Sequence, residues 1–327
     1  MSWAAAAAIG LAAALDAALG EPPERWHPVA WFGRAVAPLD RQWTRPLVAG
    51  TGGALALPVL AGVLTWALVR AASQTHALAG VVAAGGVLSV TLSRRMLLAE
   101  ARAVTELSTS DLPAARRRLQ SLAGRDATAL SPGEVRSAAV ESLAENLADG
   151  LVAPLAAFAL VAPASLPAAA GVAGWVKAVD TMDAMLGYRD KPVGTAAARL
   201  DDVAMWLPAR VAAALLAAVD GSPGAPVAAR TDAGRPPSPN SGWPMATLAE
   251  LLGVRLAKPG TYLLGDGRPL PAPDDAERAR RLADRAAWTA FVLAGLWALA
   301  LGAAPATVEL LTPAAAAGSA LEVGPRW

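Results

Sequence analysis

The chain contains no cysteine, which excludes disulfide bonds, thiolate catalysis and cysteine-ligated metals from its 327 residues. It has two histidines, His27 and His76, so a histidine-rich metal site is excluded as well. The net charge of +1 provides no strong field to attract nucleic acid, and no nucleic-acid partner is expected. A metal would need carboxylate ligands, which favours Mg²⁺.

Charge is scarce, because charged residues form 17% of the chain and hydrophobic residues form 55%. A bilayer span needs about 20 apolar residues. The first 19 residues predict a retained helix, since they lack a basic start and carry Asp16 within the apolar run. We therefore expect an all-α, multi-pass integral membrane protein in the cell membrane, with residues 1–327 forming one domain. Four charge-free windows carry this prediction: 46–69, 71–93, 150–176 and 286–304.

The distribution of arginine predicts a topology. Cytoplasmic segments of membrane proteins are enriched in Lys and Arg, so residues 94–149 and 220–285 are expected on the cytoplasmic side, as helical loops. Residues 150–176 then cannot be one simple span, and their three prolines favour a re-entrant hairpin of broken helices.

The connections are predicted from turn-forming residues. A short turn around Ser73 should join the first two windows, and the Ser131-Pro132-Gly133 sequence should begin a helix. Loops rich in Pro, Gly or Trp are expected at 20–45, 220–240 and 258–273.

The stretch "AVESLAENLADGLVAP" (139–154) carries Glu141, Glu145 and Asp149 at four-residue spacing. On a helix these acids share one side, opposite a leucine-rich side. Like charges at this spacing repel, no base lies between them, and an apolar run follows directly. One interpretation is a solvated helix side; the other is that the acids bind an external cation before the chain turns at Gly150.

A second polar cluster follows the apolar run. Acids and bases alternate in "WVKAVDTMDAMLGYRDK" and "AARLDDVAMWLPARV". If 150–176 folds back, both clusters meet and could hold Mg²⁺ through acids and phosphate through bases. For Arg199, a simple ion pair with Asp202 is an equally good interpretation. Candidate phosphate ligands are Lys177, Arg189, Arg199, Arg210, Ser238 and Asn240, and candidate metal ligands are Glu145, Asp149, Asp183 and Asp202.

The candidate catalytic residues are Glu141, Glu145, Asn146, Asp183 and His27. A lone histidine in a loop such as "RWHPVAWF" is also typical of a structural hydrogen bond. Ser238 and Asn240 lie in "RPPSPNSGWP", which alone would indicate a rigid loop. No Walker A, GxGxxG or HExxH pattern occurs, so any nucleotide site is not of a common kind.

Seven motifs, in order, resemble the CobD/CbiB family of cobalamin biosynthesis, over residues 12 to 265. The chain departs from the family pattern at Asp180, Ala184, Met205, Met245 and residues 193–195, which weakens roles carried over to Asp180 and Met205. The motifs are "LGEPPERWHPVAWFGR", "SRRMLLAEA", "GRDATALS", "ESLAENLADGLVAPL", "DTMDAMLGYRD", "AARLDDVAMWLPAR" and "SPNSGWPMA".

The resemblance implies a multi-pass membrane enzyme, adenosylcobinamide-phosphate synthase. Such an enzyme uses ATP to join the free propionate of adenosylcobyric acid to (R)-1-amino-2-propanol phosphate, or to the free aminopropanol. Mg²⁺ would be the cofactor, the active site would face the cytoplasm, and membrane lipid and other cobalamin-pathway proteins would be partners.

Two other functions fit the motifs less well. A Mg²⁺-dependent membrane prenyltransferase also pairs acid-rich helices, and "ENLAD" with "DTMD" resembles that arrangement loosely. A transporter or non-catalytic scaffold of the corrinoid pathway would share the membrane helices without needing the acids.

Overall fold

The computed structural model describes residues 2–188 and 190–303, and these residues are mostly helical. The strands β1 (Leu256–Lys258) and β2 (Tyr262–Leu264) form one small antiparallel hairpin. Short 3₁₀ turns occupy Glu24–Trp26, Ala37–Leu39 and Pro192–Gly194. The helices are α1 (Ser2–Ala18), α2 (Pro28–Val36), α3 (Pro46–Thr75), α4 (Ala77–Thr91), α5 (Arg94–Ser110), α6 (Leu112–Leu119), α7 (Pro132–Leu147), α8 (Ala153–Val161), α9 (Leu166–Leu186), α10 (Thr195–Ala204), α11 (Trp206–Asp220), α12 (Ala225–Ala228), α13 (Arg230–Ala233), α14 (Gly242–Leu252) and α15 (Pro273–Ala303).

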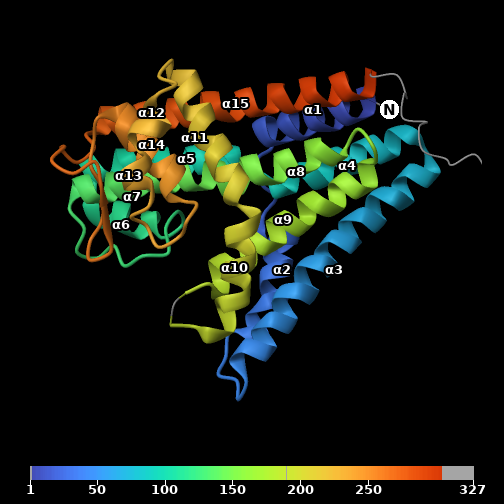
Figure 1. The fold of residues 1–327 in the computed structure, drawn as a ribbon, viewed down its shortest axis with the longest axis horizontal. Coiled ribbons are helices and arrows are strands. Elements are labelled where there is room, and N and C mark those ends of the chain that lie inside the picture. Colours follow the sequence, from blue (N-terminus) through green and yellow to red (C-terminus); the bar gives the residue numbers. More distant parts are fainter. Residues whose placement is uncertain (1, 189, 304–327) are drawn as a thin grey trace, which may run out of the picture.

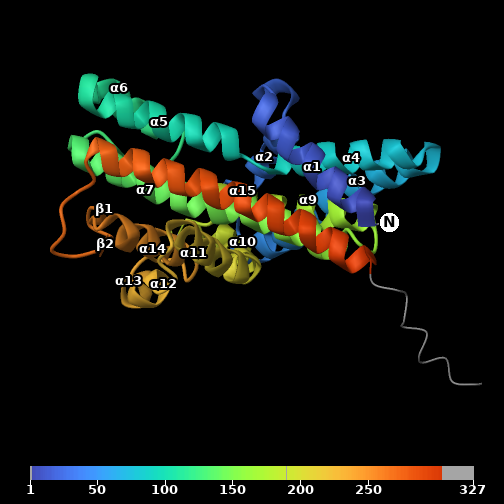
Figure 2. The same cartoon turned by 90° about the horizontal axis from the view of Figure 1, so that it is seen from above.

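The molecule has two ends of different character. Helices α1, α3, α4 and the later part of α15 run toward the end that carries the amino terminus, whereas α6, α12, α13 and α14 gather at the opposite end (Figures 1 and 2). Exposed large apolar side chains such as Leu55, Leu64 and Leu68 cover α3. Such a surface suits contact with lipid tails.

Four helical segments are long and apolar enough to cross a membrane, which supports the multi-pass prediction. They are Pro46–Thr75, Ala77–Ser110, Pro132–Val161 and Pro273–Leu301. A fifth span is possible if the pair Pro192–Ala204 and Trp206–Asp220, bent by 48°, counts as one. The spans reach well into residues 94–149, so that segment is less purely a loop than its arginines predicted.

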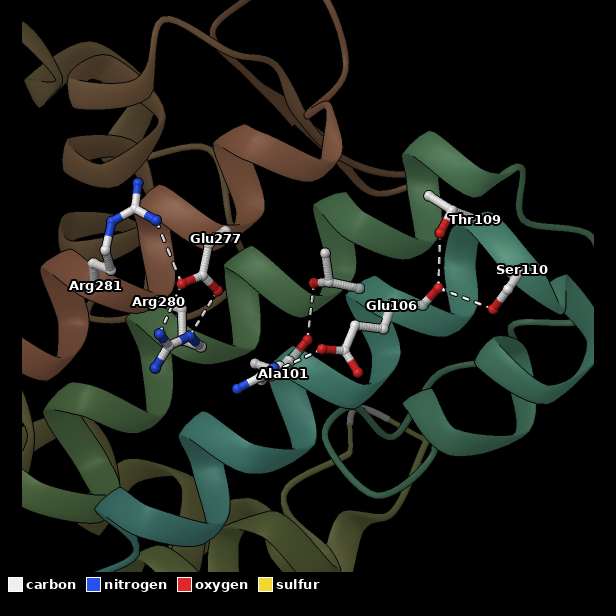
Figure 3. Close-up of polar contacts among 9 residues, drawn as sticks. Ala101, Glu106, Thr109, Ser110, Glu277, Arg280 and Arg281 are labelled. Carbon is white, nitrogen blue, oxygen red and sulfur yellow. Dashed lines mark hydrogen bonds and ion pairs between the residues drawn. The ribbon is translucent and has the colours of Figure 1, made fainter.

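The exposed side of α5 and the early part of α15 is polar. The Glu277 carboxylate accepts hydrogen bonds from Arg280 at 2.7 Å and from Arg281 at 3.4 Å. On α5 the backbone oxygen of Glu106 accepts from Thr109 and Ser110 (Figure 3). The polar surface distinguishes this end of the molecule from the lipid-facing end.

Several predicted connections are wrong in position. The turn between α3 and α4 lies at His76, not Ser73, because the Ser73 hydroxyl donates to the Val69 carbonyl within α3 at 2.7 Å. The His76 ring caps α4 by accepting from Leu78 N at 3.1 Å. The predicted loops contain α2 within 20–45, α12 and α13 within 220–240, and the β-hairpin at the start of 258–273. Local side-chain caps and packing stabilise these short elements.

The predicted cap at the start of α7 is confirmed. Ser131 Oγ accepts from Glu134 N at 3.3 Å, and Glu134 Oε2 accepts from Ser131 N at 2.7 Å. This reciprocal capping box satisfies donors that the first turn of a helix leaves unpaired. The cap fixes where the acid-bearing helix begins.

The predicted hairpin within residues 150–176 is present, whereas its re-entrant character stays a prediction, because α8 continues α7 within the candidate span Pro132–Val161. α8 ends at Val161, and α9 begins at Leu166 after Ser165 caps it by accepting from Ala168 N at 3.3 Å. α9 then returns along α3, where Thr65 Oγ1 donates to the Ala170 carbonyl at 3.1 Å. The hairpin therefore carries the chain back toward the acids of α7.

The predicted turn at Gly150 is wrong. The helix continues through a π-helical segment, Ala148–Val152, which connects α7 to α8. The Gly150 carbonyl accepts from Ser93 N at 3.1 Å, and a Cβ at Gly150 would lie 2.5 Å from Ser93 Oγ. Glycine is needed here for the close approach of Ser93 and not for a turn.

Candidate functional site

The three acids on α7 and the π-helical segment after it are not on a solvated surface. Glu141 is 1% exposed, and Glu145 and Asp149 are half-buried. Leu143 and Leu147 on the other side of the helix are also buried, so the predicted division into a polar and an apolar side is wrong. Both sides are buried because α5, α14, α15 and β1 pack around most of the helix.

The hairpin brings the second polar cluster beside the first. Helix α9 contacts both the π-helical segment Ala148–Val152, which carries Asp149, and helix α10, which carries Asp201. Lys177 Nζ contacts Asp180 Oδ2 at 2.8 Å. Side chains from α7, the π-helical segment, α9 and α10 thus share one acidic region with Lys177 within it.

Two carboxylates in this region have oxygens suited to a cation. Asp183 Oδ1 and Asp201 Oδ1 are buried, and neither has a hydrogen-bond partner within the described residues. A buried carboxylate oxygen without a partner is costly unless a ligand satisfies it. Among residues 2–188 and 190–303, no three acids or histidines converge as ligands of one ion. Mg²⁺ commonly uses one or two carboxylates together with water and substrate phosphates, so the residues present fit it.

Glu141 differs from its two neighbours because it is already paired. Its Oε2 accepts from Arg125 Nη2 at 2.7 Å and from the Tyr262 hydroxyl at 2.6 Å, and Oε1 accepts from Ser137 at 2.9 Å. The expectation that all three acids lack a base is therefore wrong for Glu141, since Arg125 comes from a distant loop. Burial, and the Glu141 carboxylate beside it, raise the pKa of Tyr262 far above its ordinary value, so the phenol remains a donor.

Three of the predicted phosphate ligands lie together. Arg210 Nη1 donates to Asn240 Oδ1 at 3.0 Å, and Ser238 Oγ accepts from Asn240 N at 3.2 Å. The Arg210 guanidinium also lies over the rings of Trp206, at 4.4 Å, and Trp243, at 5.1 Å. Asn240 Nδ2 donates to the Asp202 carbonyl at 2.8 Å, which joins the cluster to α10.

The remaining candidates lie in varied surroundings. The Asn146 amide donates to the Ser142 carbonyl of its own helix at 3.0 Å. Both nitrogens of His27 are engaged, with Nδ1 accepting from Val29 N and Nε2 lying 3.2 Å from Glu21 Oε2, as the structural interpretation expected. Arg189 lies outside the described residues.

Sequence reasoning missed residues that the structure brings to the site. Asp201, whose oxygen has no partner, is more central than Asp202, which pairs with Arg199. Arg125 and Tyr262 reach Glu141 from segments 16 and 121 residues away. Arg125 lies in the motif "GRDATALS", and Tyr262 lies in the loop predicted at 258–273. Spacing along the chain does not indicate that either residue contacts Glu141.

Comparison with known proteins identifies relatives along most of the chain. The profile of the family described as CobD/Cbib protein matches residues 9–308. The relatives include the cobalamin biosynthesis protein CobD of Klebsiella pneumoniae, 35% identical over 82% of this chain and 89% of the relative. That of Mycobacterium tuberculosis is 40% identical, over 81% of this chain and 87% of the relative. A probable CobD of Methanothrix thermoacetophila is 37% identical, over 88% and 94%. No solved structure matches the chain significantly.

Proposed function

The chain belongs to the CobD/CbiB protein family, and we propose that it acts in cobalamin biosynthesis as an adenosylcobinamide-phosphate synthase. It would join the free propionate of adenosylcobyric acid to the amine of (R)-1-amino-2-propanol phosphate, or of free aminopropanol, with ATP as co-substrate. The relatives are named as cobalamin biosynthesis proteins, which supports the pathway.

The observation that carries the proposal is the meeting of the half-buried acids of α7 and the π-helical segment after it with Lys177 and the acids of α9 and α10. A carboxylate does not condense with an amine at neutral pH. In the proposed reaction a propionate oxygen attacks the γ-phosphorus of ATP and ADP leaves; the amine then attacks the acyl carbon, phosphate leaves and a base takes the amine proton. Such a reaction needs basic groups for phosphates and acids for a cation and a proton.

The side chains divide between these tasks. Lys177, Arg199 and the Arg210–Asn240 cluster would bind phosphate oxygens. Glu145, Asp149 and Asp183, with Asp201 or Asp202, would hold Mg²⁺, which neutralises phosphate charge when bound. A carboxylate that is not engaged with the cation would accept the amine proton.

The location follows from the helices and the co-substrate. The chain is a multi-pass membrane protein, and we propose that the site faces the cytoplasm because ATP is there. Membrane lipid, and other proteins of the cobalamin pathway, are the proposed partners.

Reconstitution tests the function directly. The purified protein is incubated with adenosylcobyric acid, aminopropanol phosphate and MgATP, and the product is detected by mass. Formation of adenosylcobinamide phosphate, dependent on both ATP and protein, is expected. If only a prenyl diphosphate is consumed, or if no product forms while the corrinoid crosses the membrane, the proposal is wrong.

A further inference from the structure

Arg125 lies in the loop between α6 and α7, and its side chain is only 12% exposed. Nη2 donates to Glu141, whereas Nη1 is buried and has no hydrogen-bond partner in the part of the chain that the structure describes. A buried cationic N–H without an acceptor is costly, and a ligand oxygen would satisfy it. Nη2 of this guanidinium is thus bound to the protein, and Nη1 is available to a ligand.

The guanidinium is held from several elements at once. Glu141, its partner, also accepts from Ser137 on the same helix and from Tyr262 on β2. Ser137 Oγ in turn accepts from Ala257 N of β1 at 2.8 Å. These bonds connect α7, the β-hairpin and the Arg125 loop, so they fix the orientation of Arg125. Such pre-organisation is typical of ligand-binding groups and not required of an ordinary surface ion pair.

A second cation comes from the same hairpin. Lys258 pairs with Tyr262 across the two strands, so their side chains lie on one side of the hairpin. Leu256 and Leu264 on that side are 0% exposed, which shows that it faces inward. Lys258 forms no ion pair within 4 Å in the described chain, and Tyr262, its partner across the strands, donates to the same Glu141 carboxylate that binds Arg125. Within the described residues, Arg125 forms an ion pair with one carboxylate, Glu141, and Lys258 forms none.

We propose that Arg125 and Lys258 form an anion subsite at the Glu141 end of the acid row, which binds phosphate oxygens of a substrate. Glu141 and Tyr262 are positioning residues that orient the Arg125 fork. The inference rests on the proposed function and deepens it, because a ligase for these substrates handles two phosphates. The phosphate belongs either to the nucleotide or to the amine substrate, and Lys177 with Arg199 would serve the other.

The test uses the full chain in detergent with three variants: Arg125→Lys, Lys258→Met and Tyr262→Phe. The apparent KM is measured for ATP at saturating aminopropanol phosphate, and for aminopropanol phosphate at saturating ATP. Loss of a charge-assisted bond should raise one KM roughly tenfold or more, most for Arg125→Lys. Lys191→Met is the matched control, because Lys191 pairs with Asp40 outside the site.

The substrate whose KM rises, ATP or aminopropanol phosphate, is the one whose phosphate the subsite binds. Tyr262→Phe should raise the same KM as Arg125→Lys, by a smaller factor, with kcat less affected. Wild-type KM values for both substrates in Lys258→Met and Arg125→Lys would overturn the subsite. If Arg125→Lys does not fold, as thermal unfolding would reveal, Lys258→Met decides alone.

A binding experiment separates this inference from the proposed function. Inorganic tripolyphosphate with Mg²⁺ should raise the unfolding temperature of the wild type, and Lys258→Met should lose most of that rise. If the wild type makes no amide product but tripolyphosphate still stabilises it through Lys258, the ligase proposal fails and the anion subsite stands. If product forms and tripolyphosphate stabilises both proteins equally, the subsite fails and the ligase stands.

Discussion

The Arg199 guanidinium lies 3.5 Å from the Asp202 carboxylate one helical turn later, and its side chain is 79% exposed. An exposed pair of this length contributes little to stability, typically under about 1 kcal/mol. The ion pair that the sequence offered as an alternative is therefore present, but it leaves Arg199 free to turn toward a ligand.

Replacing Arg199 with lysine separates these two roles. If Arg199 binds phosphate through two parallel N–H groups, Arg199→Lys should weaken apparent substrate affinity, since lysine cannot form the fork. Steady-state KM values for ATP and aminopropanol phosphate provide the measurement. Unchanged activity and affinity would assign Arg199 to its pair with Asp202 alone.

Glu145 of α7 and Asp149 of the π-helical segment can be tested by nearly isosteric changes. Glu145→Gln and Asp149→Asn should each reduce turnover by two or more orders of magnitude, roughly 3 kcal/mol, because each removes a charge proposed to bind Mg²⁺. Turnover and its dependence on Mg²⁺ concentration are measured in parallel. Protein levels in the membrane should remain normal, since neither carboxylate has an ion-pair partner in the described residues.

Glu106→Gln is the matched control for these variants. Glu106 pairs with Arg102 on the exposed side of α5, and its side chain is 62% exposed (Figure 3). Its loss should leave turnover unchanged. Near-normal turnover in Glu145→Gln and Asp149→Asn, with an unaltered Mg²⁺ requirement, would remove both acids from the site.

Two glycines of α3 should respond oppositely to alanine. A Cβ at Gly50 would lie 1.9 Å from the Val193 carbonyl oxygen, whereas a Cβ at Gly52 meets nothing within 4 Å. Gly50→Ala should destabilise the protein by about 1–3 kcal/mol, because a backbone atom must move. Gly52→Ala should stabilise it by roughly 0.5–1 kcal/mol through helix propensity. Thermal unfolding in detergent compares the two, and equal unfolding temperatures would contradict the close approach of α3 to residues 192–194.

The membrane topology can be tested by cysteine labelling, since the chain has no native cysteine. Single cysteines replacing Ser110, at the end of α5, and Ser222, after α11, should react with an impermeant reagent from the cytoplasmic side only. Both residues precede helices, α6 and α12, that lie at the same end of the molecule (Figure 1). Labelling of the two positions from opposite sides would refute the topology.

The sequence predicted those features that depend on local composition. Apolar length predicted the spans, prolines predicted the hairpin, and Ser131 with Glu134 marked the start of α7. The same reasoning placed the acid row beside the acids after residue 176, because a hairpin brings its two outer ends together.

The remaining features depend on contacts between distant segments. Glu141 looked unpaired because its partners, Arg125 and Tyr262, come from a loop and a strand that no spacing rule connects to α7. Asp201 and Asp202 are adjacent in sequence, and tertiary packing decides which carboxylate is left without a partner. Gly150 suggested a turn because glycine is common in turns, whereas here it admits the Ser93 side chain.

The π-helical segment Ala148–Val152 connects α7 and α8 and sets the directions in which the side chains of α8 point relative to those of α7. An α-helix completes one turn every 3.6 residues, whereas a π-helical turn contains more residues. Side chains after the π-helical segment therefore point in other directions than they would on a continuous α-helix. Glu145 lies before this wider turn, and Asp149 lies within it. Leu155 and Phe158, both buried, lie after it. The number of residues between the acids and the hairpin is therefore fixed, because one residue fewer would rotate Phe158 out of the core or the acids away from Lys177.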